Sequence, residues 1–452
     1  MTTVKQGHFS SRIGFIMAAA GSAVGVGNIW GFPTQATTHG GGAFLLVYLF
    51  LILLLGYPML LAELMIGRHG QTNPADAMAK VASSATAKKI GKTIGFISII
   101  TATLICTFYS ILSGWFVSFA LAPLAQVSGQ TDIAAWLMDF SLSRNLVFTL
   151  LFIAMVIMVI RQGVQQGIER WSKRLMPVLL LILVAGVGYI LTQPGAMQGL
   201  EVLLVPDFSR IFEAEVLVGA LGQTFFSLTI GTGAMMVYGA YLSQKEDLGK
   251  LTAYVTLTDT SVAFLAALMV IPAMYVAQHN GVQIFAADGS LLNSDTLVFT
   301  VLPELFKTLG GMSQYLLAII FFMLMTIAGL TSAISIVEVP TSYIVEKTQL
   351  SRDKATLLVG TVIAILSMVV VFNFSALFGF MITMTTERAQ PLIALGIAIF
   401  TGWVWSRNKL ISTIAAQDGV KADSWFWKLW PVYVKFVCPL LIIVIIMQLF
   451  SQ

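Results

Sequence analysis

Residues 21–33 read Gly-Ser-Ala-Val-Gly-Val-Gly-Asn-Ile-Trp-Gly-Phe-Pro and interrupt an otherwise apolar segment at 13–37. A second apolar segment, at 215–241, carries a similar glycine-rich interruption between Gly222 and Gly233. Each glycine inside a helix costs about 1 kcal/mol relative to alanine, so both segments are predicted to unwind partway. Within a bilayer, non-helical backbone is tolerated only where it is buried in protein or lines a cavity. The alternative interpretation is that these glycines are small-residue packing faces between helices.

The composition around these two segments is that of a membrane protein. Of the 452 residues, 57% are hydrophobic and only 10% are charged, whereas about 25% of the residues in an ordinary soluble domain are charged. This excludes a disordered chain, a nucleic-acid-binding protein and a soluble enzyme. The four histidines argue against a histidine-ligated metal centre. The two cysteines, Cys106 and Cys438, lie in apolar runs and indicate no disulfide framework.

We predict an all-α polytopic membrane protein with eleven spans in a single domain, 1–452. The predicted spans are 13–37, 42–69, 91–125, 146–161, 168–192, 215–241, 247–278, 313–345, 351–373, 377–405 and 428–450. The interrupted spans are the first and the sixth, so residues 13–192 and 215–405 are predicted to form a 5+5 inverted repeat, with 428–450 as an additional helix. Interrupted spans at matching positions of two such halves indicate the binding site of a transporter.

The basic residues are distributed unevenly over the predicted loops. Twenty of the twenty-five lie on one side, and only Arg144, Arg210 and Lys307 lie in the opposite loops. The positive-inside rule therefore predicts a multi-pass protein of the cell (inner or plasma) membrane, with its N-terminus in the cytoplasm and its C-terminus outside. The residues before the first span are too polar for a signal peptide, so we expect the first helix to be retained.

The two unwound segments expose backbone groups at membrane depth. Their carbonyl oxygens suit a sodium ion, and the N–H groups at the start of a half-helix suit a carboxylate. A site of this kind binds a cation and an anionic group side by side. An amino acid together with sodium meets both requirements.

The interrupted segments and several other stretches resemble the neurotransmitter:sodium symporters, a family that includes the bacterial leucine transporter. The matching stretches are Ala20–Pro33, Gly40–Phe44, Glu63–Arg68, Gly167–Arg170, Gly222–Phe226 and Ala328–Ser332. The resemblance implies a leucine-transporter-like fold and sodium-coupled import of an amino acid or related zwitterion by alternating access. It also implies no enzymatic activity, a small-molecule substrate, a lipid-bilayer environment, no nucleic-acid partner, and a monomer or weak dimer.

The resemblance further implies two sodium sites built from oxygen ligands, which suit a hard cation. The first would use Ala23, Asn28, Ser227 and a residue of the seventh span, where Asp259 is favoured over Thr258. The second would use Gly21, Val24, Ala328, Thr331 and Ser332. For the last two residues the alternative is a hydroxyl that bonds back to the preceding helical turn.

The substrate residues implied by the resemblance come from four predicted spans. They are Ser22, Ala23, Gly27, Ile105, Tyr109, Phe226, Thr229, Thr232, Ser332 and Ile336. Tyr109 is expected to hydrogen-bond the substrate carboxylate, and Phe226 is expected to cover the site. The alternative for Tyr109 is an interfacial or packing aromatic. Thr232 replaces a bulky aromatic of the leucine-selective relative, which favours a polar or larger amino acid.

Several positions depart from the family pattern. Gly25 stands where monoamine transporters carry an acid, so the substrate is expected to bring its own carboxylate. Gly31 stands where an arginine usually closes the outer gate, and the tenth span carries Glu387 and Arg388 instead. We predict that Arg388 contacts the outer gate or the substrate. The alternative is that the two charges neutralise each other or that Arg388 snorkels.

At the inner gate, Glu346 is expected to pair with Lys5 or Arg12. Asp259 is expected to supply a fixed negative charge or to bind the first sodium directly, and either role predicts transport without chloride. Two alternatives remain. One is a proton-coupled permease of the same fold that uses Asp259, Glu63 or Glu387. The other is an amino-acid sensor that does not transport.

Overall fold

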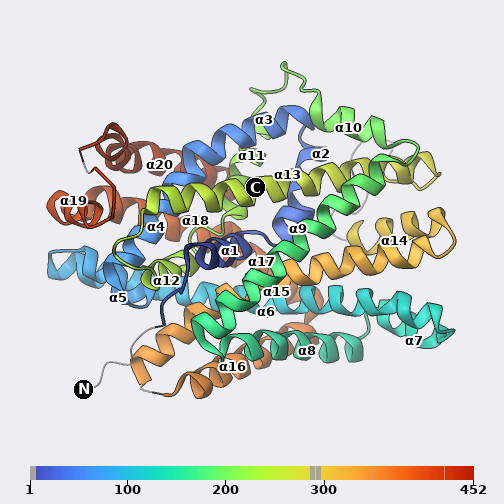
Figure 1. The fold of residues 1–452 in the computed structure, drawn as a ribbon, viewed down its shortest axis with the longest axis horizontal. Coiled ribbons are helices and arrows are strands. Elements are labelled where there is room, and N and C mark those ends of the chain that lie inside the picture. The colour runs from blue at the N-terminus through green and yellow to red at the C-terminus, as the bar shows by residue number, and fades with distance from the viewer. Residues whose placement is uncertain (1–6, 286–290, 292–296, 349, 422, 452) are drawn as a thin grey trace.

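The computed structural model describes residues 7–285, 291, 297–348, 350–421 and 423–451. Its helices form an elongated bundle whose long axis is horizontal in Figure 1. Eight continuous helical segments are long and apolar enough to cross a membrane: Gly42–Gly70, Ala85–Val127, Leu142–Ile160, Val164–Leu191, Leu248–His279, Ser313–Thr348, Arg352–Phe372 and Trp425–Leu449. Two bent pairs also qualify: Arg12–Ala23 with Gly27–Thr38, and Phe374–Val404 with Arg407–Ala415.

The first half of the chain contains α-helices and three π-helical segments, which are labelled η. They are α1 (Arg12–Ala23), η1 (Gly27–Gly31), α2 (Phe32–Thr38), α3 (Gly42–Leu51), η2 (Ile52–Gly56), α4 (Tyr57–Gly70), α5 (Pro74–Val81), α6 (Ala85–Val127), α7 (Thr131–Met138), α8 (Leu142–Ile160), η3 (Val164–Glu169), α9 (Arg170–Leu191) and α10 (Ala196–Leu204).

The second half continues in the same way, with two further π-helical segments. Its elements are α11 (Ala214–Ser227), α12 (Ala234–Ala240), α13 (Leu248–His279), α14 (Leu297–Leu309), α15 (Ser313–Thr348), α16 (Arg352–Phe372), α17 (Phe374–Ile382), η4 (Thr383–Ala389), α18 (Gln390–Ile399), η5 (Phe400–Val404), α19 (Arg407–Ala415) and α20 (Trp425–Ser451).

The predicted sixth span, 215–241, corresponds to α11 and α12. Residues Leu228–Gly233 separate these two helices, and neither is long enough to cross a bilayer alone. The first span is also broken, and its two parts meet at a bend of 57°. The prediction of an all-helical membrane protein with unwound first and sixth spans is therefore confirmed.

The break between α11 and α12 has a local cause. Three of its residues have positive φ: Thr229 at 51°, Gly231 at 92° and Gly233 at 81°. At Gly231 a side chain is excluded twice, because the backbone is left-handed and a Cβ would lie 2.5 Å from the carbonyl oxygen of Gln390. The close approach of the tenth span therefore requires this glycine.

Three of the π-helical segments precede a proline. Pro33 follows η1, Pro58 follows η2 and Pro391 follows η4, each at one of the first two positions of the next helix. Proline lacks an N–H and clashes with the preceding helical turn, and one wider turn accommodates both effects. Each π-turn also rotates the following helix face relative to the preceding one.

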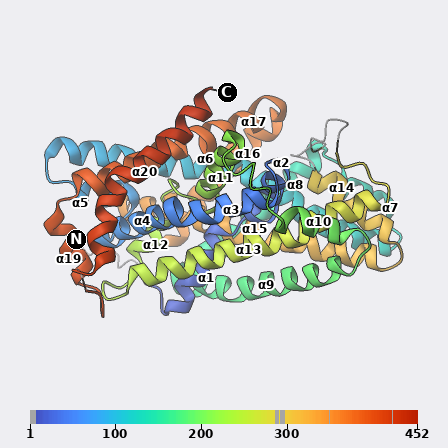
Figure 2. The same cartoon turned by 90° about the horizontal axis from the view of Figure 1, so that it is seen from above.

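The molecule has two distinct ends. In Figures 1 and 2, α5 and α19 lie at one end, whereas α7 and α14 lie at the other. We call the α5 and α19 end the basic end, because the loops there carry most of the basic residues, and the α7 and α14 end the opposite end. The breaks of the first and sixth spans lie between these ends, and α6, α13 and α15 pack around them.

Candidate functional site

A cluster of four buried polar side chains joins the first and sixth spans to α13. The side-chain amide of Asn28 donates to Asp259 Oδ1 at 2.7 Å and to Ser227 Oγ at 2.9 Å. The Ser227 hydroxyl donates to Asp259 Oδ2 at 2.7 Å, and the Tyr48 hydroxyl lies 3.3 Å from Ser227 Oγ. All four side chains are almost completely excluded from solvent.

Asp259 is therefore a buried carboxylate whose partners are neutral. Among the residues that the structure describes, no arginine, lysine or histidine forms an ion pair with it. A buried charge is costly unless it is paired or binds a metal ion. Thr258, the neighbouring alternative, turns away and donates to the carbonyl of Tyr254 at 2.8 Å. Of these two residues, Asp259 faces Asn28 and Ser227.

A second group of oxygen atoms lies where α1 ends against α15. The Ser332 hydroxyl lies 3.3 Å, 3.1 Å and 3.1 Å from the carbonyl oxygens of Gly21, Ser22 and Val24. The Thr331 hydroxyl lies 3.0 Å from the carbonyl of Ile327 and 3.1 Å from that of Ala328. The Thr331 hydroxyl thus bonds back to the preceding turn of its own helix. The Ser332 hydroxyl instead contacts the unwound segment of the first span.

A small central cavity of about 50 Å³ lies beside both clusters. Eight of the ten predicted substrate residues line it: Ala23, Gly27, Ile105, Tyr109, Phe226, Thr229, Ser332 and Ile336. Ser22 and Thr232 do not. The Thr232 hydroxyl donates to the carbonyl of Thr229 at 2.9 Å and accepts from the backbone N–H of Ala234 at 3.3 Å, so it caps the start of α12.

The cavity is shaped by glycines as much as by side chains. A Cβ at Gly27 would lie 2.5 Å from the ring of Phe226, so this ring packs directly on the unwound backbone. A Cβ at Gly25 would lie 2.7 Å from Ser332 Oγ and 3.0 Å from the Tyr109 hydroxyl. The Tyr109 hydroxyl is buried at the cavity wall, with the Ser332 hydroxyl and the backbone of Val26 as its polar neighbours. From this position it can also donate to a ligand in the cavity.

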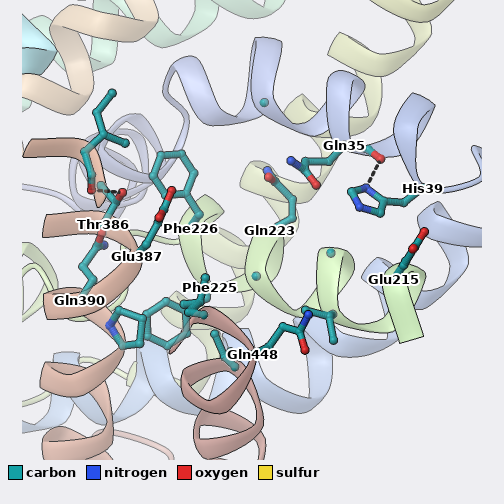
Figure 3. A pocket seen from close by; sticks show the side chains of 18 residues that line it. Gln35, His39, Glu215, Gln223, Phe225, Phe226, Thr386, Glu387, Gln390 and Gln448 are labelled. Carbon is teal, nitrogen blue, oxygen red and sulfur yellow. Dashed lines mark hydrogen bonds between the residues drawn. The ribbon is translucent and has the colours of Figure 1, made fainter. Parts of the chain in front are cut away.

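A larger cavity of about 620 Å³ also reaches Phe226 and lies between α2, α11, the tenth span and the end of α20. Figure 3 shows the polar side chains that line it, including Gln35, His39, Glu387 and Gln448. Gly31 also lines this cavity. Phe226, Thr386 and Gln390 line both cavities and therefore lie between them. Arg388 does not line either one, and its guanidinium lies 3.9 Å from the sulfur of Met384.

Four residues that line the central cavity were not singled out from the sequence: Val26, Phe108, Thr386 and Gln390. Gln390 also donates to the carbonyl of Ile230 in the break at 3.2 Å. The four-residue spacing of Thr386 and Gln390 places both on one helix face, but spacing alone did not indicate that this face meets the cavity. The buried Glu63 fixes the same break by accepting from the N–H of Gly231 at 2.6 Å.

Of the predicted inner-gate residues, Glu346 and Arg12 lie at the basic end but do not pair with each other. Glu346 accepts from the side-chain and backbone N–H groups of Asn73, at 2.6 Å and 3.1 Å, and from the Thr72 hydroxyl. Arg12 pairs with Glu246 at 2.6 Å and not with Glu346, because Glu246 lies between the sixth span and α13 beside the start of α1. Lys5 lies outside the described residues.

A further ion pair lies next to Glu346. Lys347 contacts Asp76 of α5 at 2.6 Å. Partial burial acts to raise the pKa of Asp76, but hydrogen bonds from Lys347 and Asn73 and the charge of Lys347 together lower it below its ordinary value. The carboxylate form of Asp76 is therefore favoured at neutral pH.

Comparison with known proteins places this architecture among transporters. The family model described as the sodium:neurotransmitter symporter family matches residues 6–135 and 133–452. The uncharacterized sodium-dependent transporter YhdH of Bacillus subtilis is 32% identical over 464 residues, which cover 99% of each chain. An uncharacterized sodium-dependent transporter of Haemophilus influenzae is 33% identical over 97% of this chain and 96% of its own. The crystal structure of MhsT in complex with L-phenylalanine matches with a TM-score of 0.82 and 31% identity, over 99% of this chain and 100% of that chain.

Proposed function

The chain belongs to the sodium:neurotransmitter symporter family, and from that premise we propose that it imports a neutral amino acid together with sodium. Members of this family are transporters and not enzymes, and the chain is a multi-pass membrane protein of this class. We propose that its N-terminus lies in the cytoplasm and its C-terminus outside, as the distribution of basic residues indicates. The basic end is then the cytoplasmic end, and the opposite end is the outer end.

The observation that carries the proposal is the buried carboxylate of Asp259. It lies against Asn28 and Ser227 with no basic partner among the described residues. A sodium ion bound by these side chains and by the carbonyl of Ala23 would supply the missing positive charge. Oxygen ligands of this type are those that a hard cation prefers.

The second sodium would be held between α1 and α15. The carbonyl oxygens of Gly21 and Val24 converge on the hydroxyl of Ser332, with Thr331 next to it and Ala328 one turn earlier on α15. All of these ligands are neutral, so the cation would be held by dipoles alone. The site joins the unwound first span to a helix of the other half of the chain.

The central cavity supports an amino acid as the substrate. The Tyr109 hydroxyl lies beside Ser332 at the cavity wall and can donate to a carboxylate, and the space at Gly25 is closed by Ser332 and Tyr109 rather than by an acid. Ile105, Phe108 and Ile336 give the remaining wall an apolar character. Because Thr232 does not line the cavity, it gives no reason to expect a polar side chain. An apolar or aromatic amino acid fits best, and L-phenylalanine is the ligand in the MhsT structure.

The same contacts suggest how the ions drive transport. Sodium neutralises Asp259 and bridges the unwound segment to α13, which completes the amino-acid site. The two five-helix repeats then move relative to each other and expose the site to the cytoplasm. Each positive charge that enters down a potential of 100 mV contributes about 2.3 kcal/mol. Because Asp259 already supplies a fixed negative charge, we propose that no chloride is needed.

The test is uptake of radiolabelled phenylalanine into proteoliposomes at fixed pH. We expect accumulation with an inward sodium gradient, none when choline replaces sodium, and no change when gluconate replaces chloride. Asp259→Asn should abolish sodium-driven uptake, and Thr258→Val is the matched control that should retain it. Accumulation in choline driven by a proton gradient would refute sodium coupling. Sodium-dependent binding without accumulation would indicate a sensor.

A further inference from the structure

A cleft far from the transport site lies at the basic end of the bundle, between η5, α19 and α20. Its volume is about 530 Å³. Figures 1 and 2 show α19 and the start of α20 side by side at this end, which also holds α5. Helix α19 turns by 97° from the tenth span, so it runs along the membrane surface rather than across it. The cleft is therefore positioned at the level of lipid headgroups.

The charge of the cleft is predominantly positive. Arg407, Lys428 and Lys435 line it, against a single carboxylate, Asp423. Among the residues that the structure describes, none of these three basic side chains forms an ion pair. Basic pockets between membrane helices at the cytoplasmic surface bind anionic lipid headgroups.

Lys435 occupies an unusual position for a cation. It lies ten residues beyond the start of α20 at Trp425, which is about 15 Å along the helix axis. Its ammonium group is 4.2 Å from the ring centroid of Trp403, and the Trp403 indole donates to the Lys435 carbonyl at 2.9 Å. Trp403 itself is more than half exposed. The cation is thus held near the bilayer by an aromatic ring and not by a carboxylate.

The wall of the cleft contains an unsatisfied donor. Trp405 lines the cleft and is only 4% exposed, and its indole Nε1 has no hydrogen-bond partner among the described residues. A buried N–H without a partner is costly, so such a group indicates a ligand acceptor. The first turn of α19 adds to this, because Ser406 makes no side-chain capping bond to it.

We propose that this cleft binds the headgroup of an anionic phospholipid, phosphatidylglycerol, from the cytoplasmic leaflet. The phosphate lies among Arg407, Lys428 and Lys435, and the buried indole of Trp405 turns toward the cleft to donate to it. The glycerol hydroxyls donate to Asp423, which explains the one carboxylate among the cations. The acyl chains follow the exposed apolar face of α20, where Val432, Phe436 and Leu440 point away from the bundle. The bound lipid joins α19 to α20.

The test is native mass spectrometry of the full-length protein titrated with phosphatidylglycerol or phosphatidylethanolamine. We expect tighter binding of phosphatidylglycerol. The triple variant Arg407→Gln, Lys428→Gln, Lys435→Gln should bind it about a hundredfold more weakly. The control triple Lys88→Gln, Lys89→Gln, Lys354→Gln removes three exposed basic residues from the same side and should bind like the wild type.

Two further measurements separate the possible causes. Trp405→Phe keeps the ring and removes the donor, and should weaken phosphatidylglycerol binding about tenfold. Inorganic phosphate at the same concentration should not raise the melting temperature, whereas phosphatidylglycerol should. Equal binding of the two lipids, equal losses in both triple variants, or stabilisation by phosphate alone would each overturn the proposal. Sodium-driven uptake by the variants serves as the check that they are folded.

Discussion

The opposite end and the basic end of the bundle, which we propose to be the outer and the cytoplasmic ends, are built in different ways. At the outer end a cavity of about 620 Å³ descends to the ring of Phe226. At the basic end, several carboxylates hold basic or amide partners. The closest ion pairs there are Glu338–Arg352, Lys347–Asp76 and Arg12–Glu246, each at 2.6 Å.

This difference indicates that separate forces control the two gates. Two ion-paired side chains can separate at a modest free-energy cost when water hydrates each of them. The cytoplasmic gate can therefore open when water enters it. The outer gate relies on an aromatic ring that packs on backbone, and it closes by excluding water from the central cavity. We therefore expect the cytoplasmic gate to respond to removal of charge and the outer gate to respond to removal of ring area.

The largest expected effect is at Glu338, the most deeply buried acid of the cytoplasmic gate. It is fully excluded from solvent, pairs with Arg352 at 2.6 Å and accepts from the Tyr241 hydroxyl at 2.5 Å. Arg352→Gln leaves this carboxylate without its cation, which should cost the closed state about 3 kcal/mol. A reporter cysteine, Ser342→Cys, lies on α15 between Glu338 and Glu346 and is buried in the closed form. It should react faster with a polar thiol reagent in the variant.

Two controls make this measurement specific to the buried pair. Asp353→Asn breaks the neighbouring exposed pair with Arg161, which spans 3.6 Å, and should change the labelling rate little. The double variant Glu338→Gln, Arg352→Gln should recover part of the wild-type protection. Cys106 and Cys438 are both buried and should add little background labelling. An unchanged labelling rate in Arg352→Gln would show that the pair is not part of the gate.

At the outer end, Phe226 is the residue whose loss should matter most. Phe226→Ala removes the ring that covers Gly27 and lies between the two cavities. The ring is 42% exposed, so its removal should forfeit about 1–2 kcal/mol of apolar contact and raise the KM for the amino acid about tenfold. Phe226→Tyr keeps the ring and should restore the wild-type KM. A change in Ser342→Cys labelling equal to that in Arg352→Gln would contradict the separation of the two gates.

The sequence predicted the two breaks because their causes are local. Glycine and positive φ act within a few residues, so Gly231 and Gly233 could be interpreted without knowledge of the fold. Ion-pair partners are not local. Arg12 meets Glu246, 234 residues away, and nothing in either segment specifies that contact. The short helices α5, α10, α14 and α19 were also not predicted, because they lie in loops and lack the length of a span.

The face of the tenth span was likewise beyond prediction from spacing alone. Glu387 and Arg388 lie inside η4, where a π-turn adds a residue and rotates the helix face. As a result Glu387 lines the outer cavity while Arg388 does not. The same rotation brings Thr386 and Gln390 to the central cavity. The charged residues of this segment were noted from the sequence. The directions in which their side chains point depend on the π-turn in the backbone.

A smaller effect is expected for the charges of the outer cavity. Glu387→Gln removes a carboxylate that lines the approach to Phe226, and should change the KM for the amino acid about twofold to fivefold, more at low salt. Arg388→Gln is the matched control from the adjacent position, and should leave the KM unchanged because its side chain does not line the cavity. A larger effect from Arg388→Gln would support a direct role of the arginine in gating or substrate binding.

The smallest effect should come from Asp76, whose pair with Lys347 is partly exposed at 24% and 38% of the two side chains. Asp76→Asn should cost less than about 1 kcal/mol. The contacts lower the pKa of Asp76 below its ordinary value of 3.8. The carboxylate therefore makes its full contribution to the free energy of unfolding above pH 3.8. Its contribution is lost only as the pH falls through the lower pKa of the folded state. The melting temperatures of wild type and variant should therefore differ by a constant amount from about pH 8 to about pH 5, and converge only under stronger acid. If the two melting temperatures already converge between about pH 7 and pH 6, a group other than Asp76 is titrating. Asp76 would then not be one of the charged residues that stabilise this end.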